Sequence, residues 1–217
     1  MGPTKLSDAA KTRRLHVKAM WSVPVVVAIL ATIGLLSKSV AAATDHTASF
    51  VQKSASEAIN ILSNISLADL DRREKFRSVI LKHFDAPSIG RNVVEPYWSK
   101  ASPEQQARFQ LTFESALADI YTDRFFDYDG QSLQIKETVA DAGGVTVVKT
   151  TVSTPTGSKT YDVDWVVAGP AGKEQFLDVV IDGISTSVTT KQDYASVLRS
   201  KNGDLDALTA ALEAKRH

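Results

Sequence analysis

Histidines and paired carboxylates are the side chains best suited to acid–base chemistry, and this sequence holds few of them in a useful spacing. His83 and Asp85 lie two positions apart, and a histidine base with a carboxylate that orients it is one arrangement used in acid–base catalysis. Residues two apart on a helix do not face each other, however, and the sequence places no nucleophile beside them. The pair therefore does not predict a catalytic site.

Asp162 and Asp164 fall on one face of a predicted strand, where two carboxylates can share a metal ion or a proton. The solvated face of a half-buried strand explains the same pattern. The sequence has no cysteine, which excludes a zinc–thiolate site and a thiol nucleophile. It also lacks a glycine-rich phosphate loop, an HExxH helix and an EF-hand spacing. We therefore expect no catalytic residues, no metal and no cofactor.

The charge of the chain is unevenly distributed. Of 25 basic and 25 acidic residues, residues 1–43 hold six basic and one acidic, so residues 44–217 carry a net charge of −5. Binding to nucleic acid relies on clustered Lys and Arg, so we expect no nucleic-acid partner.

The basic N-terminal segment leads into an apolar run, Met20–Leu36, and then into small residues ending at Ala43. These are the parts of a secretory signal peptide, with cleavage expected after Ala42 or Ala43. An uncleaved membrane anchor is the alternative, because the run is near the lower length limit for crossing a bilayer. We assign residues 1–43 to this segment and residues 44–217 to a single exported domain.

The helices and strands that would position a functional site are predicted from the spacing of apolar residues and from capping residues. Helical spacing is expected over residues 44–64, and a capping box of Ser66 and Asp69 predicts the start of a second helix. Asp85 predicts the cap of a third helix, which Pro96 should end. Ser102, followed by Pro103 and Gln105, predicts a long fourth helix that continues to about Phe125.

After residue 130 the period changes to two. Strands are predicted near residues 133–139, 145–153, 161–167 and 174–181, and the helical pattern returns after Asp182-Gly183. Helices, then four consecutive strands, then helices indicate an α+β fold. We expect one domain with a curled four-stranded antiparallel sheet packed against helices.

Large apolar side chains are concentrated on the long fourth helix and on the third strand. They include Phe109, Phe113, Tyr121, Tyr161 and Trp165. A filled core is the usual fate of such residues, and composition by itself favours that reading over a ligand cavity.

Several short motifs over residues 50–215 carry a family resemblance. In chain order they are His83-Phe84-Asp85, Ile89-Gly90-Arg91, Tyr97-Trp98, Ala101 to Gln105 with Phe109, Tyr121 with Arg124, Tyr128-Asp129-Gly130, Asp178-Val179 and Asp182 to Ser185. Their joint order and spacing resemble the toluene-tolerance family, whose best-known members are periplasmic phospholipid carriers of the MlaC type.

The resemblance implies a lipid cavity between sheet and helices. Its implied wall residues are Phe109, Phe113, Leu117, Tyr121, Val163, Trp165, Val179 and Ile184. Arg91, Arg124 and Lys191 are candidates for contact with the lipid head group or with a partner. The implied partners are a phospholipid, an inner-membrane ABC lipid transporter and an outer-membrane lipoprotein complex. The protein itself is expected to be a periplasmic monomer.

Three alternatives stay open at this point. A related branch of the family is associated with hopanoid-producing bacteria, and the sequence does not separate it from the phospholipid branch. An enzyme on a cone-like α+β fold would need an inward acid, for which Asp178 is the candidate. An adaptor domain would have a filled interior. A dry cavity of several hundred Å³ would favour the carrier over both of the other classes.

Overall fold

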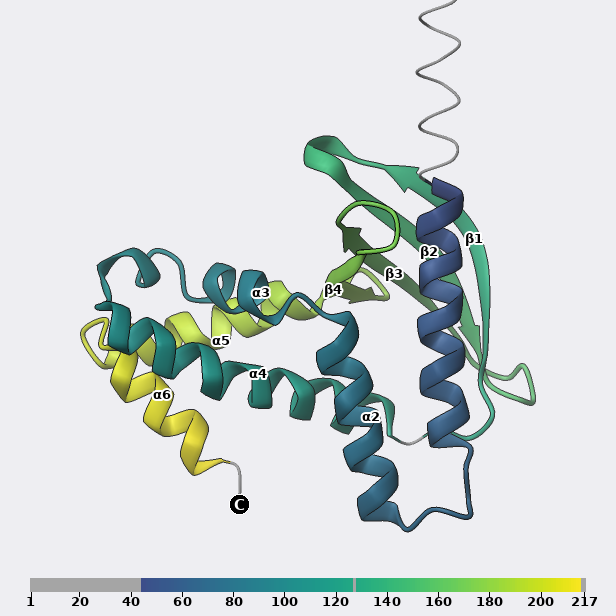
Figure 1. Ribbon diagram of the computed structural model, residues 1–217, viewed down its shortest axis with the longest axis horizontal. Helices are drawn as coiled ribbons and strands as arrows, with labels where there is room; N and C mark the ends of the chain where they lie inside the picture. Colours follow the sequence, from purple (N-terminus) through teal and green to yellow (C-terminus); the bar gives the residue numbers. More distant parts are fainter. Residues whose placement is uncertain (1–43, 127, 216–217) are drawn as a thin grey trace, which may run out of the picture. The chain divides into compact units, whose positions relative to one another are not determined.

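The computed structural model describes residues 44–126 and 128–215, and Figure 1 shows how their helices and strands follow one another. The expected signal segment, residues 1–43, lies outside the described residues. Within the described part of the chain, no helix is long and apolar enough to cross a membrane.

Helices form both ends of the described chain. They are the first described helix (residues 44–62), α2 (Asp69–His83), α3 (Ala86–Val93), α4 (Pro103–Phe125), α5 (Thr186–Ser200) and α6 (Leu205–Ala214). Two predicted starts are confirmed. Ser102 and Gln105 form a reciprocal capping box with Pro103 in the first turn of α4, and Asp85 accepts a hydrogen bond from the Ser88 amide at 3.0 Å. Each cap satisfies amides that the first turn leaves without a helical partner.

The predicted capping box at Ser66 is wrong. The N-cap of α2 is Ala68, and no side chain caps that end. Ser66 instead donates from its hydroxyl to Asn64 Oδ1 at 2.6 Å and from its amide to the same oxygen at 3.1 Å. Ser66 therefore forms its hydrogen bonds with the side-chain oxygen of Asn64 in a local turn, and its hydroxyl does not cap α2.

The sheet is an antiparallel meander in sequential order, curled as Figure 1 shows, and the α+β fold prediction is confirmed. Its strands are β1 (Ser132–Ala140), β2 (Val145–Ser153), β3 (Thr160–Ala168), β4 (Gln175–Ile181) and the short β5 (Ile184–Ser185). Register shifts in β1 and between Val166 and Val167 of β3 are positions where a strand bends and its twist increases. The two-residue β5 adds a strand to the four predicted, because Asp182 and Gly183 adopt positive φ and turn the chain back onto β4.

The core is built around α4, which packs against α2, α3 and α6. Phe109, Phe113 and Tyr121 on this helix are at most 1% exposed. The sheet joins the helices at the end of α2, where the Asp85 amide donates to the Phe176 carbonyl at 3.0 Å. This backbone hydrogen bond holds β4 against the end of α2, so that one face of β3 and β4 lies opposite the helices.

Candidate functional site

A cavity of about 470 Å³ lies between the first described helix, α2, the end of α4 and one face of the sheet. It is partly open to solvent, and most of its lining is apolar. The lining residues are Ser54, Ala55, Ala58, Ile59, Leu62, Phe76, Val79, Ile80, His83, Phe84, Arg124, Phe125, Tyr128, Gln131, Ser132, Leu133, Val152, Tyr161, Val163, Trp165, Phe176 and Ile181.

The sheet wall follows from strand register. Tyr161 pairs with Val152, and Val163 pairs with Ile181, so these four side chains share one face. Trp165 extends the same face, and its ring centre lies 5.1 Å from that of Phe176. Of the eight predicted wall residues, Val163 and Trp165 line this cavity.

The opposite wall comes from the first described helix and α2. Ser54, Ala58 and Leu62 recur at a spacing of four, so they lie along one helical face. The small side chains at 54, 55 and 58 leave room beside the sheet. The helix expected over residues 44–64 is present over 44–62, but helical spacing by itself did not predict that small side chains on this face leave a cavity.

Polar lining residues gather where α4 passes into β1: Arg124, Tyr128, Gln131 and Ser132. Arg124 is exposed, and its guanidinium donates to Thr186 Oγ1 at 3.3 Å. A fixed positive charge thus stands at the margin of an apolar cavity. Such a charge suits an anionic group of a bound molecule.

His83 is a second polar lining residue. Its Nε2 lies 2.8 Å from Glu57 Oε2, and Lys82 Nζ donates to both oxygens of the same carboxylate. Hydrogen bonds from Lys82 and His83 hold the pKa of Glu57 below its ordinary value. Glu57 is therefore ionised at neutral pH and anchors the His83 ring.

The other six predicted wall residues do not line the cavity. Phe109, Phe113, Leu117, Tyr121 and Val179 are at most 3% exposed and belong to the packed core. The reason is that neighbouring side chains fill the apolar face of α4, as in the Phe84–Tyr121 contact with ring centres 4.3 Å apart. Burial also raises the pKa of the Tyr121 hydroxyl. Ile184, on the short β5, is 62% exposed.

The two remaining predicted basic residues lie on α3 and α5 and are not part of the cavity lining. The Arg91 guanidinium lies 5.5 Å from the centre of the Trp98 ring. Lys191 Nζ lies 3.4 Å from Asn92 Oδ1. Both side chains therefore contact neighbouring residues of the protein outside the cavity.

Asp178 is the acid that the enzyme alternative would need, and its carboxylate is hydrogen-bonded to residues between β4 and the start of α5. Its Oδ1 accepts from the amides of Val179 and Ser187 at 2.9 Å, and Ser185 Oγ donates to its Oδ2. It is half-buried and does not line the cavity. Among residues 44–126 and 128–215, no group of three or more His, Asp or Glu side chains is placed to hold a metal ion.

The comparison with protein families agrees with this architecture: the model of the MlaC protein family matches residues 52–214. The chain belongs to the MlaC family. The matched range contains all the strands and helices α2 to α6. Of the first described helix it contains residues 52–62. All residues that line the cavity lie within the matched range.

Two known proteins resemble this MlaC-family chain. The toluene tolerance protein ttg2D of Pseudomonas putida is 27% identical over 123 residues, which cover 56% of this chain and 57% of that protein. The chain thus matches little more than half the length of this curated relative. A phospholipid-binding protein from Ralstonia solanacearum, solved in complex with a phospholipid, shares the fold with a TM-score of 0.65 and 22% identity. That match covers 79% of this chain and 95% of the solved one.

Proposed function

We propose that this protein is a periplasmic carrier that moves phospholipid between the outer and inner membranes. Its partners would be an outer-membrane lipoprotein complex and an inner-membrane ABC transporter. The observation that carries the proposal is the largely apolar cavity of about 470 Å³ between sheet and helices. Family membership and the phospholipid bound by the Ralstonia solanacearum protein support it.

The cavity volume suits one acyl chain. An engineered protein cavity of about 150 Å³ holds one benzene. The present cavity is roughly three times larger. If three times the volume holds three times the six carbons of benzene, it has room for a chain of roughly eighteen carbons. Each methylene moved out of water contributes about 0.8 kcal/mol, so a free lipid hardly leaves a membrane unaided. A carrier needs an interior similar to the bilayer, and the lining supplies that.

The charge at the margin suggests how the head group is placed. Arg124 is exposed and lies among the polar lining residues Tyr128, Gln131 and Ser132. In the proposed complex its guanidinium pairs with the lipid phosphate, for which its planar fork is suited. Arg91 and Lys191 lie away from the lining, so they are proposed as contacts with a partner protein.

A carrier also needs no reaction at the bound lipid. The engagement of Asp178 with the amides of the β4–α5 turn supports a role in structure for this acid. The proposed activity is accordingly binding and transfer, without catalysis.

The proposal is tested by purifying the exported protein from a bacterial periplasm and analysing an organic extract by mass spectrometry. We expect close to one phospholipid per protein. Ala58→Phe places a ring in the cavity and should abolish co-purification, because Ala58 lines it. Ala107→Phe, at an exposed position of α4, is the control and should keep the lipid.

The outcomes separate the alternatives. A hopanoid in the extract would replace phospholipid as the cargo. A wild-type protein that stays lipid-free after incubation with phospholipid vesicles would overturn the carrier function. Equal lipid content in the two Phe variants would show that this cavity is not the binding site.

A further inference from the structure

Two strongly exposed aliphatic side chains lie where the first described helix is connected to α2. Ile65, in the connection itself, is 91% exposed, and Leu70, in the first turn of α2, is 82% exposed. Among the large apolar residues of the described chain these two are the most exposed. A single exposed aliphatic side chain is common on protein surfaces, so the position of the pair decides whether it has a role.

The chain on either side of the pair leads directly to the cavity. Leu62, three residues before Ile65, lines the cavity, and so does Phe76, six residues after Leu70. Figure 1 shows the connection at the lower ends of the first described helix and α2. Residues 63–70 therefore lie at one end of the cavity wall that these two helices form.

This end of the wall is the one beside Arg124 and the polar lining. Arg73, three residues after Leu70, pairs with Asp123 at 2.6 Å. Its guanidinium also lies 4.5 Å from the centre of the Phe126 ring. Arg124 lies between Asp123 and Phe126 in the chain, so the last turn of α4 is beside the start of α2. A lipid whose head group is at Arg124 therefore enters and leaves the cavity close to the exposed pair.

The backbone of the connection is hydrogen-bonded within its own turn. The Ile65 amide donates to the Ser63 carbonyl at 3.0 Å, and the Leu67 amide donates to the Asn64 carbonyl at 3.2 Å. The Ser66 amide donates to Asn64 Oδ1 at 3.1 Å. A segment that enters the edge of a bilayer has to satisfy its own polar backbone groups. These bonds satisfy three amides in advance, so the turn is suited to contact with lipid.

The charge around the pair is balanced. Residues 63–75 hold three acidic and three basic side chains, so their net charge is zero. Two of the arginines are already paired, because Arg72 lies 2.7 Å from Asp69 and Arg73 pairs with Asp123. Binding to an anionic membrane uses an excess of Lys and Arg, and residues 63–75 have no such excess. The pair therefore fits a lipid surface that is bound through apolar contact.

A protein partner fits this segment less well. Strong contacts between proteins are centred on Trp, Tyr and Arg, whereas leucine is under-represented there. Residues 63–75 contain no Trp and no Tyr, and the guanidiniums of Arg72 and Arg73 already face carboxylates of the same chain.

We propose that Ile65 and Leu70 insert into the surface of a neutral lipid bilayer, so that the protein takes up and releases its lipid at the membrane itself. This inference rests on the proposed carrier function and adds a step to it, because that function names only protein partners. A tail that leaves the cavity at this end passes into the bilayer without crossing water.

The first test is flotation of the protein, purified from a bacterial periplasm, with phosphatidylcholine vesicles. Ile65→Gln and Leu70→Gln should each lower the affinity for the vesicles about tenfold, because moving one such side chain from lipid into water corresponds to roughly that factor. Raising the salt from about 0.1 M to about 1 M should not weaken wild-type binding, because the contact does not depend on charge.

Leu111→Gln is the matched control for these variants. Leu111 is 72% exposed, lies on α4 and does not line the cavity. It precedes Asp123 by twelve residues, or about 18 Å along the helix at about 1.5 Å per residue. Its loss should leave the affinity for vesicles unchanged.

A second measurement reports on the contact directly. The sequence has no cysteine, so Ile65→Cys and Leu111→Cys can each be labelled at a single site with a fluorophore whose emission shifts to the blue in an apolar environment. Phosphatidylcholine vesicles should shift the emission at position 65 and leave it unchanged at position 111.

The proposal fails if the wild type does not float with the vesicles, or if the three Gln variants bind them equally. An emission at position 65 that vesicles do not change would also overturn it, as would binding that requires anionic lipid and is lost in high salt. The carrier function is judged separately, by the phospholipid that co-purifies. A protein that carries phospholipid but does not bind vesicles keeps that function and exchanges its lipid through protein partners alone.

Discussion

Trp165 donates a hydrogen bond from Nε1 to Thr150 Oγ1 at 3.1 Å across the β2–β3 pair. The same hydroxyl donates to the Val163 carbonyl at 2.8 Å, so Thr150 is both donor and acceptor. Thr150 is 2% exposed, whereas Trp165 lines the cavity. A buried threonine therefore fixes the orientation of an aromatic wall residue.

Thr150→Val should loosen that wall while keeping its shape. The substitution removes the hydroxyl and leaves Trp165 Nε1 without its partner, at a cost of about 1–3 kcal/mol in the free energy of unfolding. We expect a lower urea midpoint and a change in the fluorescence quenching of Trp165 by bound lipid. Thr151→Val, on the opposite face of β2, is the matched control. Identical behaviour of the two variants would contradict the role assigned to Thr150.

Local chemistry made much of the fold predictable. The start of α4 could be read from Ser102, Pro103 and Gln105, because all the groups of a capping box lie within four residues. The start of α2 could not be read from Ser66, because Asn64 offered a competing acceptor at equally short range. Local signals decide a structure only where no second partner is within reach.

The cavity was harder to predict than the fold, and α4 shows why. Periodicity identifies which side of a helix turns inward, but it does not show whether neighbouring side chains fill the space there. Phe113 points inward into a filled region, whereas Ala55 and Ala58 point inward where room remains. The available signal was the small size of residues on the first described helix, facing the large aromatic Trp165.

Gly90→Ala should destabilise the helical core. A Cβ at this position would lie 2.8 Å from Phe113 Cδ1 and 2.9 Å from Gln110 Oε1, closer than carbon contacts allow. Overpacking of this kind costs about 1–3 kcal/mol. Chemical denaturation should show this loss relative to Ser88→Ala, an exposed change on the same helix. A stability at or above that of the control would mean that α3 and α4 can shift apart to accommodate the added methyl group without loss of stability.

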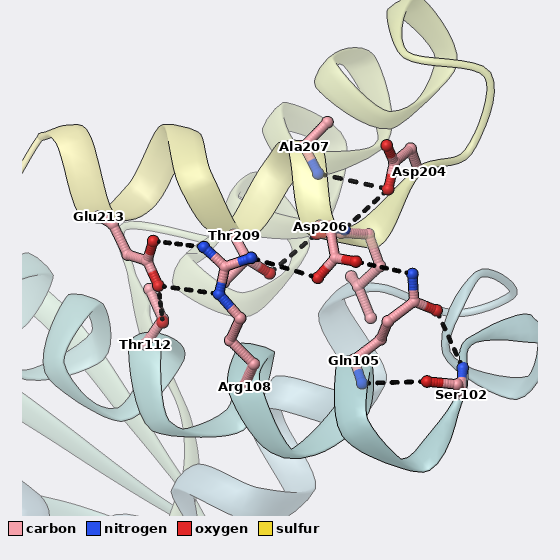
Figure 2. A network of polar contacts seen from close by, with 10 residues as sticks. Ser102, Gln105, Arg108, Thr112, Asp204, Asp206, Ala207, Thr209 and Glu213 are labelled. Atoms are coloured by element: carbon pink, nitrogen blue, oxygen red, sulfur yellow. Dashed lines mark hydrogen bonds and ion pairs between the residues drawn. The ribbon is translucent and has the colours of Figure 1, made fainter.

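The contact between α4 and α6 includes a surface ion network (Figure 2), and α6 also carries the buried leucines Leu205, Leu208 and Leu212. Arg108 reaches Glu213 at 2.7 Å and Asp206 at 3.4 Å, and Thr112 donates to Glu213 at 3.2 Å. The Arg108 side chain is 47% exposed, so water and salt screen its ion pairs. Leu208 on α6, in contrast, is 1% exposed. Apolar packing should therefore hold α6 more strongly than the charges do.

Leu208→Ala and Arg108→Ala test that order. Loss of the leucine leaves a cavity and should lower the free energy of unfolding by about 2–5 kcal/mol. Loss of the arginine should have a much smaller effect, which decreases further in 1 M salt. The measurement is urea unfolding of each variant at low and high salt. A larger loss for Arg108→Ala would show that the network of Figure 2, and not the leucine, docks α6.

Glu57 makes the contact between the first described helix and α2 dependent on pH. Hydrogen bonds from Lys82 and His83 lower its pKa from the ordinary 4.5, so the folded protein binds a proton here less readily than the unfolded chain. The stability from these bonds is complete above pH 4.5 and is lost as the pH falls through the lowered value. Glu57→Gln should therefore be less stable than the wild type at pH 7, and the difference should shrink below pH 4.5. The carboxylate is partly exposed, so the difference should also decrease with added salt. Urea midpoints measured from pH 7 downward check this, and a difference that grows in acid would reverse the assignment.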